Sequence, residues 1–411
     1  MGIFGTRKAA YAATALAVGV ALMGVPPATA APKVTSAPDV QTPSVGPTAV
    51  IDGVPYVGAE LRKQYDYDYA GCKNPDGTTP NGYRAEWLQD GVPLPPERQG
   101  EVLQLTPADF GHRISLRVHP STPEEPNCPD ATRVSPGTAP VKASSRAMGW
   151  TGRGNFEPLG RTADGRLILY PRTYTYVPGS CEGACPRYFG EWDEPRQTGQ
   201  GWDAMGIVFS PGDFDGDGYN DLLATDAAGN LYLYPGDGNG GWLDRRQVGQ
   251  GWNIFDSIVG PGDFDGDGYN DVLARDAAGD LYLYPGDGAG GWKPRSKVGQ
   301  GWQIMDKIIT GGDMNGDGPV EVFARDRNGY LSIYRADGTG GWESSAMLSG
   351  GWGAFSDIAG LGSFGHQQYN NLFAVNGNGD LMTYSTGAST GVLWGPYGPV
   401  GAGWNVFREL L

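Results

Sequence analysis

The sequence predicts an all-β protein in which a small β-sandwich precedes a β-propeller of five four-stranded blades. Three observations support this prediction. An aromatic motif recurs about every 50 residues, an acidic loop lies inside several of the repeats, and the C-terminal segment supplies a strand that the first repeat lacks. A repeat of this length made of short strands is typical of propeller blades, because each blade is a four-stranded antiparallel sheet.

The chain begins with a segment that is typical of a secretory signal. Arg7 and Lys8 form a basic start, residues 9–24 are apolar, and Ala28 to Ala30 supply the small residues that signal peptidase prefers. We therefore expect residues 1–30 to be a cleaved signal peptide, with an uncleaved anchor as the alternative. The expected product is secreted and extracellular, with no membrane span after cleavage and with cell-wall association left open.

The composition narrows the class of protein. The 411 residues include 68 Gly and 32 Pro, but also 12 Trp and 21 Tyr at regular spacing, which favours short strands and turns over disorder. The formal charge is −16, and loss of Arg7 and Lys8 with the signal makes it −18. A nucleic-acid partner is not expected, because no basic face is available.

Four cysteines, an even number, are typical of an oxidising compartment. Cys72 and Cys128 bracket the N-terminal domain, and Cys181 and Cys185 lie close together in one segment. We expect two disulfides, 72–128 and 181–185, although spacing alone does not fix the pairing. The alternative is a metal site, but the three His residues show no metal-ligand spacing.

Composition also divides the chain into domains. The predicted organisation is a signal peptide at 1–30, a Pro/Thr/Ser-rich linker at 31–47, a β-sandwich at 48–135, a second linker at 136–149, and the propeller at 150–411.

The domain at 48–135 contains three runs with alternating apolar residues, at 57–61, 83–91 and 103–118. Such alternation indicates half-buried strands. The runs resemble a bacterial immunoglobulin-like module, through "VG..L", a strand with Trp87 before a turn, and "T..D.G..I.V.V". The resemblance implies an immunoglobulin-like β-sandwich. Because this domain shows no catalytic motif, we expect it to be a spacer or a platform for cell-wall contact.

The repeats at 150–411 are defined by three aromatic columns. A Gly-Trp pair recurs at Trp202, Trp252, Trp302, Trp352 and Trp404. A second Trp lies ten residues upstream of each, at Trp192, Trp242, Trp292, Trp342 and Trp394. A strand of the type Leu-x-Leu-Tyr ends at Tyr170, Tyr234, Tyr284, Tyr334 and Tyr384. The sequence therefore contains five copies, each long enough for four strands.

The two ends of this region are complementary. Residues 152–171 align without gaps on 266–285, so the first copy lacks the opening strand of its unit. Residues 403–411 match that missing strand. We expect the C-terminal strand to complete the first blade and close the ring, which would remove an open sheet edge.

An acidic loop at 213–221 recurs at 263–271 and, with changes, at 313–321. Oxygen ligands at positions 1, 3, 5 and 9 and a backbone carbonyl at position 7 match the first part of an EF-hand loop. The candidate ligands are Asp213, Asp215, Asp217, Tyr219, Asp221, Asp263, Asp265, Asp267, Tyr269, Asp271, Asp313, Asn315, Asp317, Pro319 and Glu321.

The alternative for these loops is a solvated acidic turn, but four carboxylates within nine residues repel one another unless a cation is present. We expect about three structural Ca²⁺ ions. The fourth copy, 363–371, has lost every carboxylate, and the first copy has Arg153 and Glu157 at ligand positions. Both are expected to be empty.

Two family resemblances follow from these motifs. The acidic loop with its following strand resembles the FG-GAP or VCBS-type calcium repeat that is also found in integrin propellers. The frame "G-G-W…V-G-Q-G-W-x-x-F…G-x-L-Y" resembles the tachylectin-type five-bladed propeller lectins, which lack the calcium loop. The second resemblance implies binding of N-acetylhexosamine-type sugars, with a separate pocket in each blade.

The lectin resemblance implies a multivalent binding module for extracellular glycans. Several weak sites on one surface would add up to strong attachment. The candidate ligand-binding residues are Trp192, Trp242, Trp292, Trp342, Trp394, Tyr234, Tyr284 and Tyr334. The alternative for these rings is a purely structural role between blades.

Other function classes stay open. One is a protein-binding adhesin or scaffold, with a protein partner in place of a glycan. The other is a glycan-active hydrolase, with Asp193 and Glu194 as the nearest candidate pair. We expect no enzyme and assign no catalytic residues, because the sequence has no Gly-x-Ser-x-Gly or His-Glu-x-x-His motif. A monomer is expected.

Overall fold

The computed structural model describes residues 49–65, 83–120, 132–154, 156–177, 187–315, 317–362, 364, 370–386, 393–395 and 398–411. All of them belong to one compact unit, Val45–Leu411, and the other unit is Met1–Ser44. In these ranges the regular elements are β-strands and short 3₁₀ turns, and no helix is long and apolar enough to span a bilayer. The predicted signal peptide and all four cysteines, with their two predicted disulfides, lie outside the described residues.

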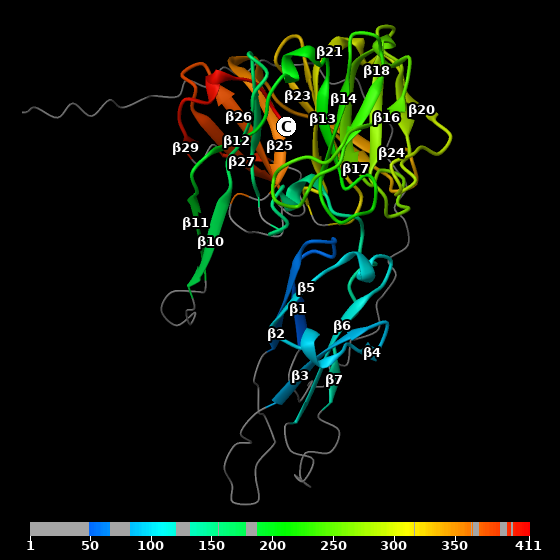
Figure 1. Cartoon of the computed structure of the whole chain (residues 1–411), viewed down its shortest axis with the longest axis vertical. Helices are drawn as coiled ribbons and strands as arrows, with labels where there is room; N and C mark the ends of the chain where they lie inside the picture. The colour runs from blue at the N-terminus through cyan, green and yellow to red at the C-terminus, as the bar shows by residue number, and fades with distance from the viewer. Residues whose placement is uncertain are drawn as a thin grey trace, which may run out of the picture. The chain divides into compact units, whose positions relative to one another are not determined.

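Two sheets form the N-terminal region (Figure 1). The first has the order β1 (Ala49–Asp52), β2 (Glu60–Tyr65), β5 (Val102–Gln104). The second has the order β4 (Val92–Pro93), β3 (Tyr83–Gln89), β6 (Ile114–Pro120), β7 (Arg133–Val134). Two 3₁₀ turns accompany them, η1 (Pro96–Arg98) and η2 (Pro107–Asp109). The apolar residues of both sheets share one core around Leu61, Trp87 and Leu116, as alternation along half-buried strands requires. The immunoglobulin-like assignment stays a prediction.

Five more sheets follow the sequence repeat. The first is β12 (Arg196–Gly199), β9 (Leu167–Leu169), β8 (Leu159–Thr162), β30 (Phe407–Leu410). The second is β13 (Val208–Gly212), β14 (Asp221–Thr225), β15 (Leu231–Tyr234), β16 (Arg246–Gly249). The third is β17 (Phe255–Gly262), β18 (Asp271–Asp276), β19 (Leu281–Tyr284), β20 (Ser296–Gly299).

The fourth sheet is β21 (Met305–Gly312), β22 (Glu321–Asp326), β23 (Leu331–Ala336), β24 (Trp342–Ser349). The fifth is β25 (Phe355–Gly362), β26 (Asn371–Asn376), β27 (Leu381–Thr386), with β28 (Leu393–Trp394) and β29 (Pro399–Gly401) both paired to β27. A separate two-stranded ribbon consists of β10 (Arg172–Val177) and β11 (Arg187–Trp192). Counting the second N-terminal sheet, the described residues thus hold six sheets of four or more strands, and five of them follow the repeat.

The C-terminal strand β30 pairs antiparallel with β8, as the sequence predicts. Phe407 lies opposite Thr162, Leu410 lies opposite Gly160, and the N–H of Leu411 donates to Leu159 O at 2.8 Å. Gly160 is required here, because a Cβ atom would lie 2.4 Å from the Phe407 ring. The last residues of the chain therefore complete the sheet that the first repeat begins.

Each repeat opens on the same tight turn. These 3₁₀ turns are η4 (Trp202–Ala204), η5 (Trp252–Ile254), η6 (Trp302–Ile304), η7 (Trp352–Ala354) and η8 (Trp404–Val406). The preceding glycine is left-handed, with φ of 75° at Gly251, which explains why glycine recurs before each Trp. The N–H of Trp252 donates to Gly229 O at 2.9 Å, and its side chain is buried. The Gly-Trp column is therefore part of the core.

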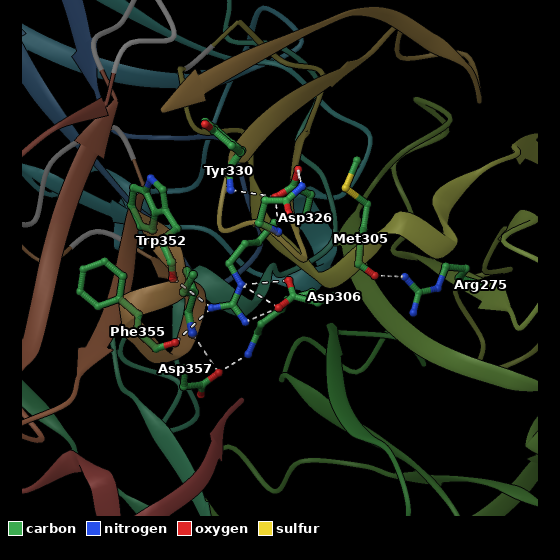
Figure 2. A network of polar contacts seen from close by, with 12 residues as sticks. Arg275, Met305, Asp306, Asp326, Tyr330, Trp352, Phe355 and Asp357 are labelled. Carbon is green, nitrogen blue, oxygen red and sulfur yellow. Dashed lines mark hydrogen bonds and ion pairs between the residues drawn. The ribbon is translucent and has the colours of Figure 1, made fainter. Parts of the chain in front are cut away.

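Arginines tie successive sheets together. Arg275 on β18 donates to Trp302 O at 3.0 Å and to Met305 O at 2.6 Å, both at the start of the next repeat. One repeat later, Arg325 on β22 donates in the same way to Trp352 O and Phe355 O, and also to the Asp306 carboxylate. Figure 2 shows these three acceptors close together. A guanidinium suits this position because its fixed fork of N–H groups reaches several acceptors at once.

Candidate metal centres

The first acidic loop connects β13 to β14 and brings three carboxylates together. Asp213, Asp215 and Asp221 each offer an oxygen within 4.8 Å of the others, at loop positions 1, 3 and 9. Asp213 and Asp221 are buried, and Asp215 is half-buried. Such a cluster of hard oxygens has the donor chemistry that divalent cations prefer.

Backbone N–H groups fix the outer carboxylates of this cluster. The Asp213 oxygens accept from Gly216 at 2.7 Å and from Gly218 at 3.0 Å. The Asp221 oxygens accept from Phe214 at 2.8 Å and from Gly236 at 3.0 Å. Asp215 Oδ1, in contrast, is buried and has no hydrogen-bond partner. Since buried polar atoms are normally paired, this oxygen marks a place for a cation or an ordered water.

The second loop, between β17 and β18, repeats the arrangement. Asp263, Asp265 and Asp271 again offer oxygens within 4.8 Å of one another. Asp271 accepts from the N–H groups of Phe264 at 2.8 Å and Gly286 at 3.0 Å. The same carboxylate cluster and the same backbone hydrogen bonds thus occur in both loops, as expected if the repeated sequence motif determines them.

The third loop, between β21 and β22, uses different donors. The Asn315 amide donates to Glu321 Oε1 at 2.7 Å and to Asp317 Oδ2 at 2.7 Å. Glu321 Oε2 accepts from the N–H of Met314 at 2.8 Å, and Asp313 Oδ2 accepts from Gly318 at 2.9 Å. The Asn315 amide therefore donates hydrogen bonds to two acidic side chains of the third loop, whereas an aspartate occupies this position in the first two loops.

Burial makes these carboxylates hard to ionise. It raises the pKa of Asp213 to about 7 and of Asp271 to about 8, with neighbouring carboxylates adding to the effect. Burial also raises the pKa of Glu321 to about 7. Each loop thus holds acidic groups in a place where their charged forms are unfavourable without a cation.

Positions 5 and 7 behave differently from positions 1, 3 and 9. Asp217 accepts from the N–H of Tyr219 at 2.8 Å, and Asp267 forms an ion pair with Lys293. Neither carboxylate belongs to the described clusters of three.

The side chains at position 7 pack against neighbouring residues. The Tyr269 ring stacks on Phe110, with ring centroids 5.0 Å apart. It also lies so close to Gly288 that a Cβ atom on this glycine would be 2.2 Å from the ring. At position 7 of the third loop, Pro319 lies 3.5 Å from where a Cβ of Gly338 would stand.

The first and fourth copies were expected to be empty. Glu157 of the first copy accepts from Thr151 Oγ1 at 2.6 Å, from the N–H of Trp150 at 2.7 Å and from the N–H of Thr151 at 2.9 Å. Protein donors thus fill this position. Most of 363–371 lies outside the described residues.

Several residues around the loops were not predicted. The position-8 amides of Asn220 and Asn270 donate to Gly149 O at 2.6 Å and to Ser144 O at 2.8 Å. Lys142 Nζ lies 3.0 Å from Asp263 Oδ2 and 3.2 Å from Gly318 O. The recurrence of Asn at position 8 could have been found by aligning the repeats. Lys142 carries no such signal, because it lies outside the repeats.

The segment at 136–149, predicted as a linker, packs closely against these loops. The N–H of Ala143 donates to Gly268 O at 3.0 Å, and the N–H of Asp213 donates to Ser144 O at 2.9 Å. Ala143 and Ser144 are both buried. The short turn η3 (Arg146–Met148) lies within this segment. The acidic loops therefore also form the contact surface for the segment that leads to the N-terminal sheets.

The upstream tryptophans lie between neighbouring sheets. Trp192, Trp242, Trp292 and Trp342 are half-buried, and the side chain of Trp394 lies outside the described residues. The indole N–H of Trp292 donates to Val248 O and that of Trp342 to Val298 O, both at 2.8 Å, and that of Trp192 to Val400 O at 3.1 Å. The rings of Trp192, Trp292 and Trp342 are therefore each held by a backbone carbonyl of another sheet, and all four rings expose only part of their surface.

The predicted tyrosines pack against the Gly-Trp column. Tyr234 lies 4.5 Å from Trp202, Tyr284 lies 4.7 Å from Trp252, and Tyr334 lies 4.5 Å from Trp302, between ring centroids. The hydroxyls of Tyr234 and Tyr284 accept from Arg245 at 2.7 Å and Arg295 at 2.6 Å. Two of these tyrosines also lie beside an upstream tryptophan, with ring centroids 5.9 Å apart for Tyr284 and Trp292 and 5.7 Å apart for Tyr334 and Trp342. All four of these rings are half-buried.

Comparison with known proteins agrees with the repeat architecture. The FG-GAP-like repeat family matches residues 213–274 and 263–324, which include all three acidic loops. Residues 213–324 are therefore similar to FG-GAP-like repeats. No curated protein sequence matches the chain.

The solved structures that match the chain include two lectins. The BP39L lectin from Burkholderia pseudomallei is 15% identical, with a TM-score of 0.38, covering 86% of this chain and 95% of its own. A lectin of Agrocybe aegerita, described as recognising non-reducing terminal N-acetylglucosamine, is 13% identical, with a TM-score of 0.35. The match covers 88% of this chain and 90% of the lectin. The Dos1 propeller is 10% identical, with a TM-score of 0.29, and the match covers 68% of this chain and 66% of the Dos1 chain.

Proposed function

We propose that the three acidic loops bind Ca²⁺ and that the ions are structural. The observation that carries this proposal is the triple cluster of Asp213, Asp215 and Asp221, in which a buried oxygen of Asp215 has no hydrogen-bond partner. In each loop the ligands would be the side chains at positions 1, 3, 5 and 9 and the carbonyl at position 7. A bound Ca²⁺ would neutralise carboxylates that otherwise repel one another, and so would hold the loop in shape.

Calcium titration of EDTA-treated protein by calorimetry tests this proposal. We expect about three ions per chain, with dissociation constants on the order of 0.1–1 mM. Asp221→Asn and Asp271→Asn should each remove one ion. Asp226→Asn, which changes a half-buried turn carboxylate outside the acidic loops, should leave the count unchanged. Failure to bind calcium in a folded sample would contradict the proposal.

We also propose that the five sheets of the repeat form one closed, five-bladed ring. The strands at the same end position of successive sheets are neighbours: β13 with β17, β17 with β21, β21 with β25, and β25 with β30. The pairing of β30 with β8 supports closure, because it joins the last residues to the first repeat. A crystal structure of the protein tests the number of blades directly.

We further propose that the protein is a secreted, multivalent binding module for carbohydrate rather than an enzyme. What supports this is the recurrence of a partly exposed Trp beside a Tyr at successive sheet junctions, since aromatic faces stack on sugar rings. Repeated weak sites would gain strength by engaging one surface together. A protein-binding adhesin or scaffold is the second candidate.

A glycan array with calcium, and again with EDTA, distinguishes these candidates. Selective binding to N-acetylated sugars that weakens in EDTA would support a lectin whose sheets depend on the ions. Absence of sugar binding in a folded, calcium-loaded sample would exclude the lectin and favour the adhesin or scaffold.

A further inference from the structure

A cavity of about 390 Å³ lies where three parts of the chain meet. The N-terminal sheets contribute Tyr56 and Arg62, and the segment before the first repeat contributes Arg146. The repeats contribute small residues at the ends of the first strands of four successive sheets. These are Pro211, Gly260, Gly311 and Gly360. Because glycine and proline fill little space, the ends of these strands leave an open volume in the size range of small-molecule sites.

Arg146 is the unusual residue in this lining. Its Nη2 donates to Thr310 O at 2.6 Å, and no carboxylate among the described residues forms an ion pair with it. A guanidinium has five N–H groups, so this carbonyl satisfies only a small part of its donor capacity. Burial lowers the pKa of Arg146 to about 10. Arg146 is half-buried, and an anion or ordered water in the cavity would complete the hydrogen bonds of its guanidinium.

The other cations of the lining are already paired. Arg62 lies 2.6 Å from Glu60, and Arg153 lies 3.5 Å from Asp193. The lining carboxylate of Asp263 is matched by Lys142 at 3.0 Å. Among the three arginines of the lining, Arg146 is therefore the one for which the described residues show no carboxylate in an ion pair.

We propose that this cavity binds a small anionic ligand, a carboxylate or another oxyanion up to the size of a monosaccharide acid, with Arg146 as the anion-binding group. An arginine fork matches the two oxygens of such an anion, which a lysine does not. The site is separate from the half-exposed tryptophans at the sheet junctions, so it goes beyond the proposed glycan binding.

The calcium loops bear on this site through charge. Asp263 and Asp313 belong to the second and third loops and also line the cavity. Cations bound in these loops would make the local potential more positive, and would therefore favour an anion at Arg146. We expect anion affinity to be higher with calcium than with EDTA.

The experiment is calorimetric titration of calcium-loaded protein with sodium D-glucuronate and with sodium sulfate, with methyl glucoside as the neutral control. Glucuronate or sulfate should bind, and methyl glucoside should not. Arg146→Met should weaken anion binding by about tenfold to a hundredfold, as expected for loss of a charged hydrogen bond. Arg146→Lys, which keeps the charge and helps folding, should weaken it by several-fold.

Arg153→Met is the matched control, because it removes an equal charge from the same lining but one that is paired with Asp193. Bromide soaked into crystals of the unaltered protein gives a second readout, an anomalous peak beside the Arg146 guanidinium. The proposal is overturned if neither anion binds and no bromide peak appears there. It is also overturned if Arg146→Met binds like the unaltered protein, or if Arg153→Met loses as much affinity as Arg146→Met.

Discussion

The ammonium group of Lys142 lies 3.0 Å from a carboxylate oxygen of Asp263, the residue at position 1 of the second acidic loop. The same ammonium donates to Gly318 O of the third loop at 3.2 Å. One lysine from outside the repeats therefore touches two proposed calcium loops, and its charge competes with a cation at Asp263.

Replacing Lys142 with Met should therefore tighten calcium binding at the second loop. We expect about fivefold higher affinity, corresponding to ~1 kcal/mol for a partly exposed ion pair. Calorimetric titration of EDTA-treated protein measures this change. Lys297→Met is the control, because Lys297 pairs with Asp280 in a turn away from the loops. Weaker calcium binding in Lys142→Met would show that the lysine supports the loop rather than competing.

Calcium-free protein should become less stable as the pH rises. Asp213 and Asp271 have folded pKa values of about 7 and about 8, against an ordinary value of 3.8. A carboxyl with a raised folded pKa stabilises the protein below its unfolded pKa, and this contribution is lost as the pH rises through the folded pKa. In EDTA, the melting temperature should fall between about pH 5 and about pH 8. Excess calcium should remove this fall, and a fall of equal size with calcium present would contradict the assignment.

Arg275→Met should destabilise the junction between the third and fourth sheets. Arg275 is only 8% exposed, and its loss leaves Trp302 O and Met305 O without this donor. We expect the free energy of unfolding to fall by about 2–3 kcal/mol. Chemical denaturation measures it, with the exposed Arg245→Met as a control expected to change stability by less than ~0.5 kcal/mol. Equal effects in both variants would mean that the inter-sheet contact is unimportant.

Trp292 and Trp242 occupy equivalent places but differ in one hydrogen bond. The indole N–H of Trp292 donates to Val248 O, whereas that of Trp242 is buried without a partner. Trp292→Phe should therefore cost about 1–2 kcal/mol more stability than Trp242→Phe. Thermal unfolding of the two variants compares them directly. If both variants stay folded but bind glycan more weakly, the two tryptophan rings contact the ligand in addition to stabilising the sheet junction.

Deleting residues 407–411 should expose the edge of β8. β30 supplies the backbone partners of β8, and unpaired strand edges promote association between chains. We expect a lower melting temperature and aggregation on size-exclusion chromatography. A monomeric, fully stable deletion variant would contradict the closed ring.

Much of the repeat could be predicted because its signals are local. The Gly-Trp spacing marks where each repeat begins, and the Leu-x-Leu-Tyr strand predicted to end at Tyr284 is β19. The spacing of the upstream tryptophans does not show where the next strand begins. Trp292 makes only an isolated bridge with Gly286, and β20 begins at Ser296.

The rest could not be predicted because it depends on contacts between distant segments. Nothing near Lys142 in the sequence indicates that it meets Asp263, and nothing near Phe110 indicates that it stacks on Tyr269. Likewise, the pairing of Asp267 with Lys293 depends on where a following turn places the lysine. Spacing within a loop identifies candidate ligands, but not which of them a neighbouring cation already occupies.

The pairing of β8 with β30 has a consequence for the order in which the protein folds. β8 is among the first strands of the repeats to leave the ribosome, whereas β30 is the last strand of the chain. The first sheet therefore waits for its fourth strand until β30 has been synthesised. Since contacts between distant segments slow folding, ring closure is expected to be a late kinetic step. During that interval the edge of β8 is open to chaperones or to a neighbouring nascent chain.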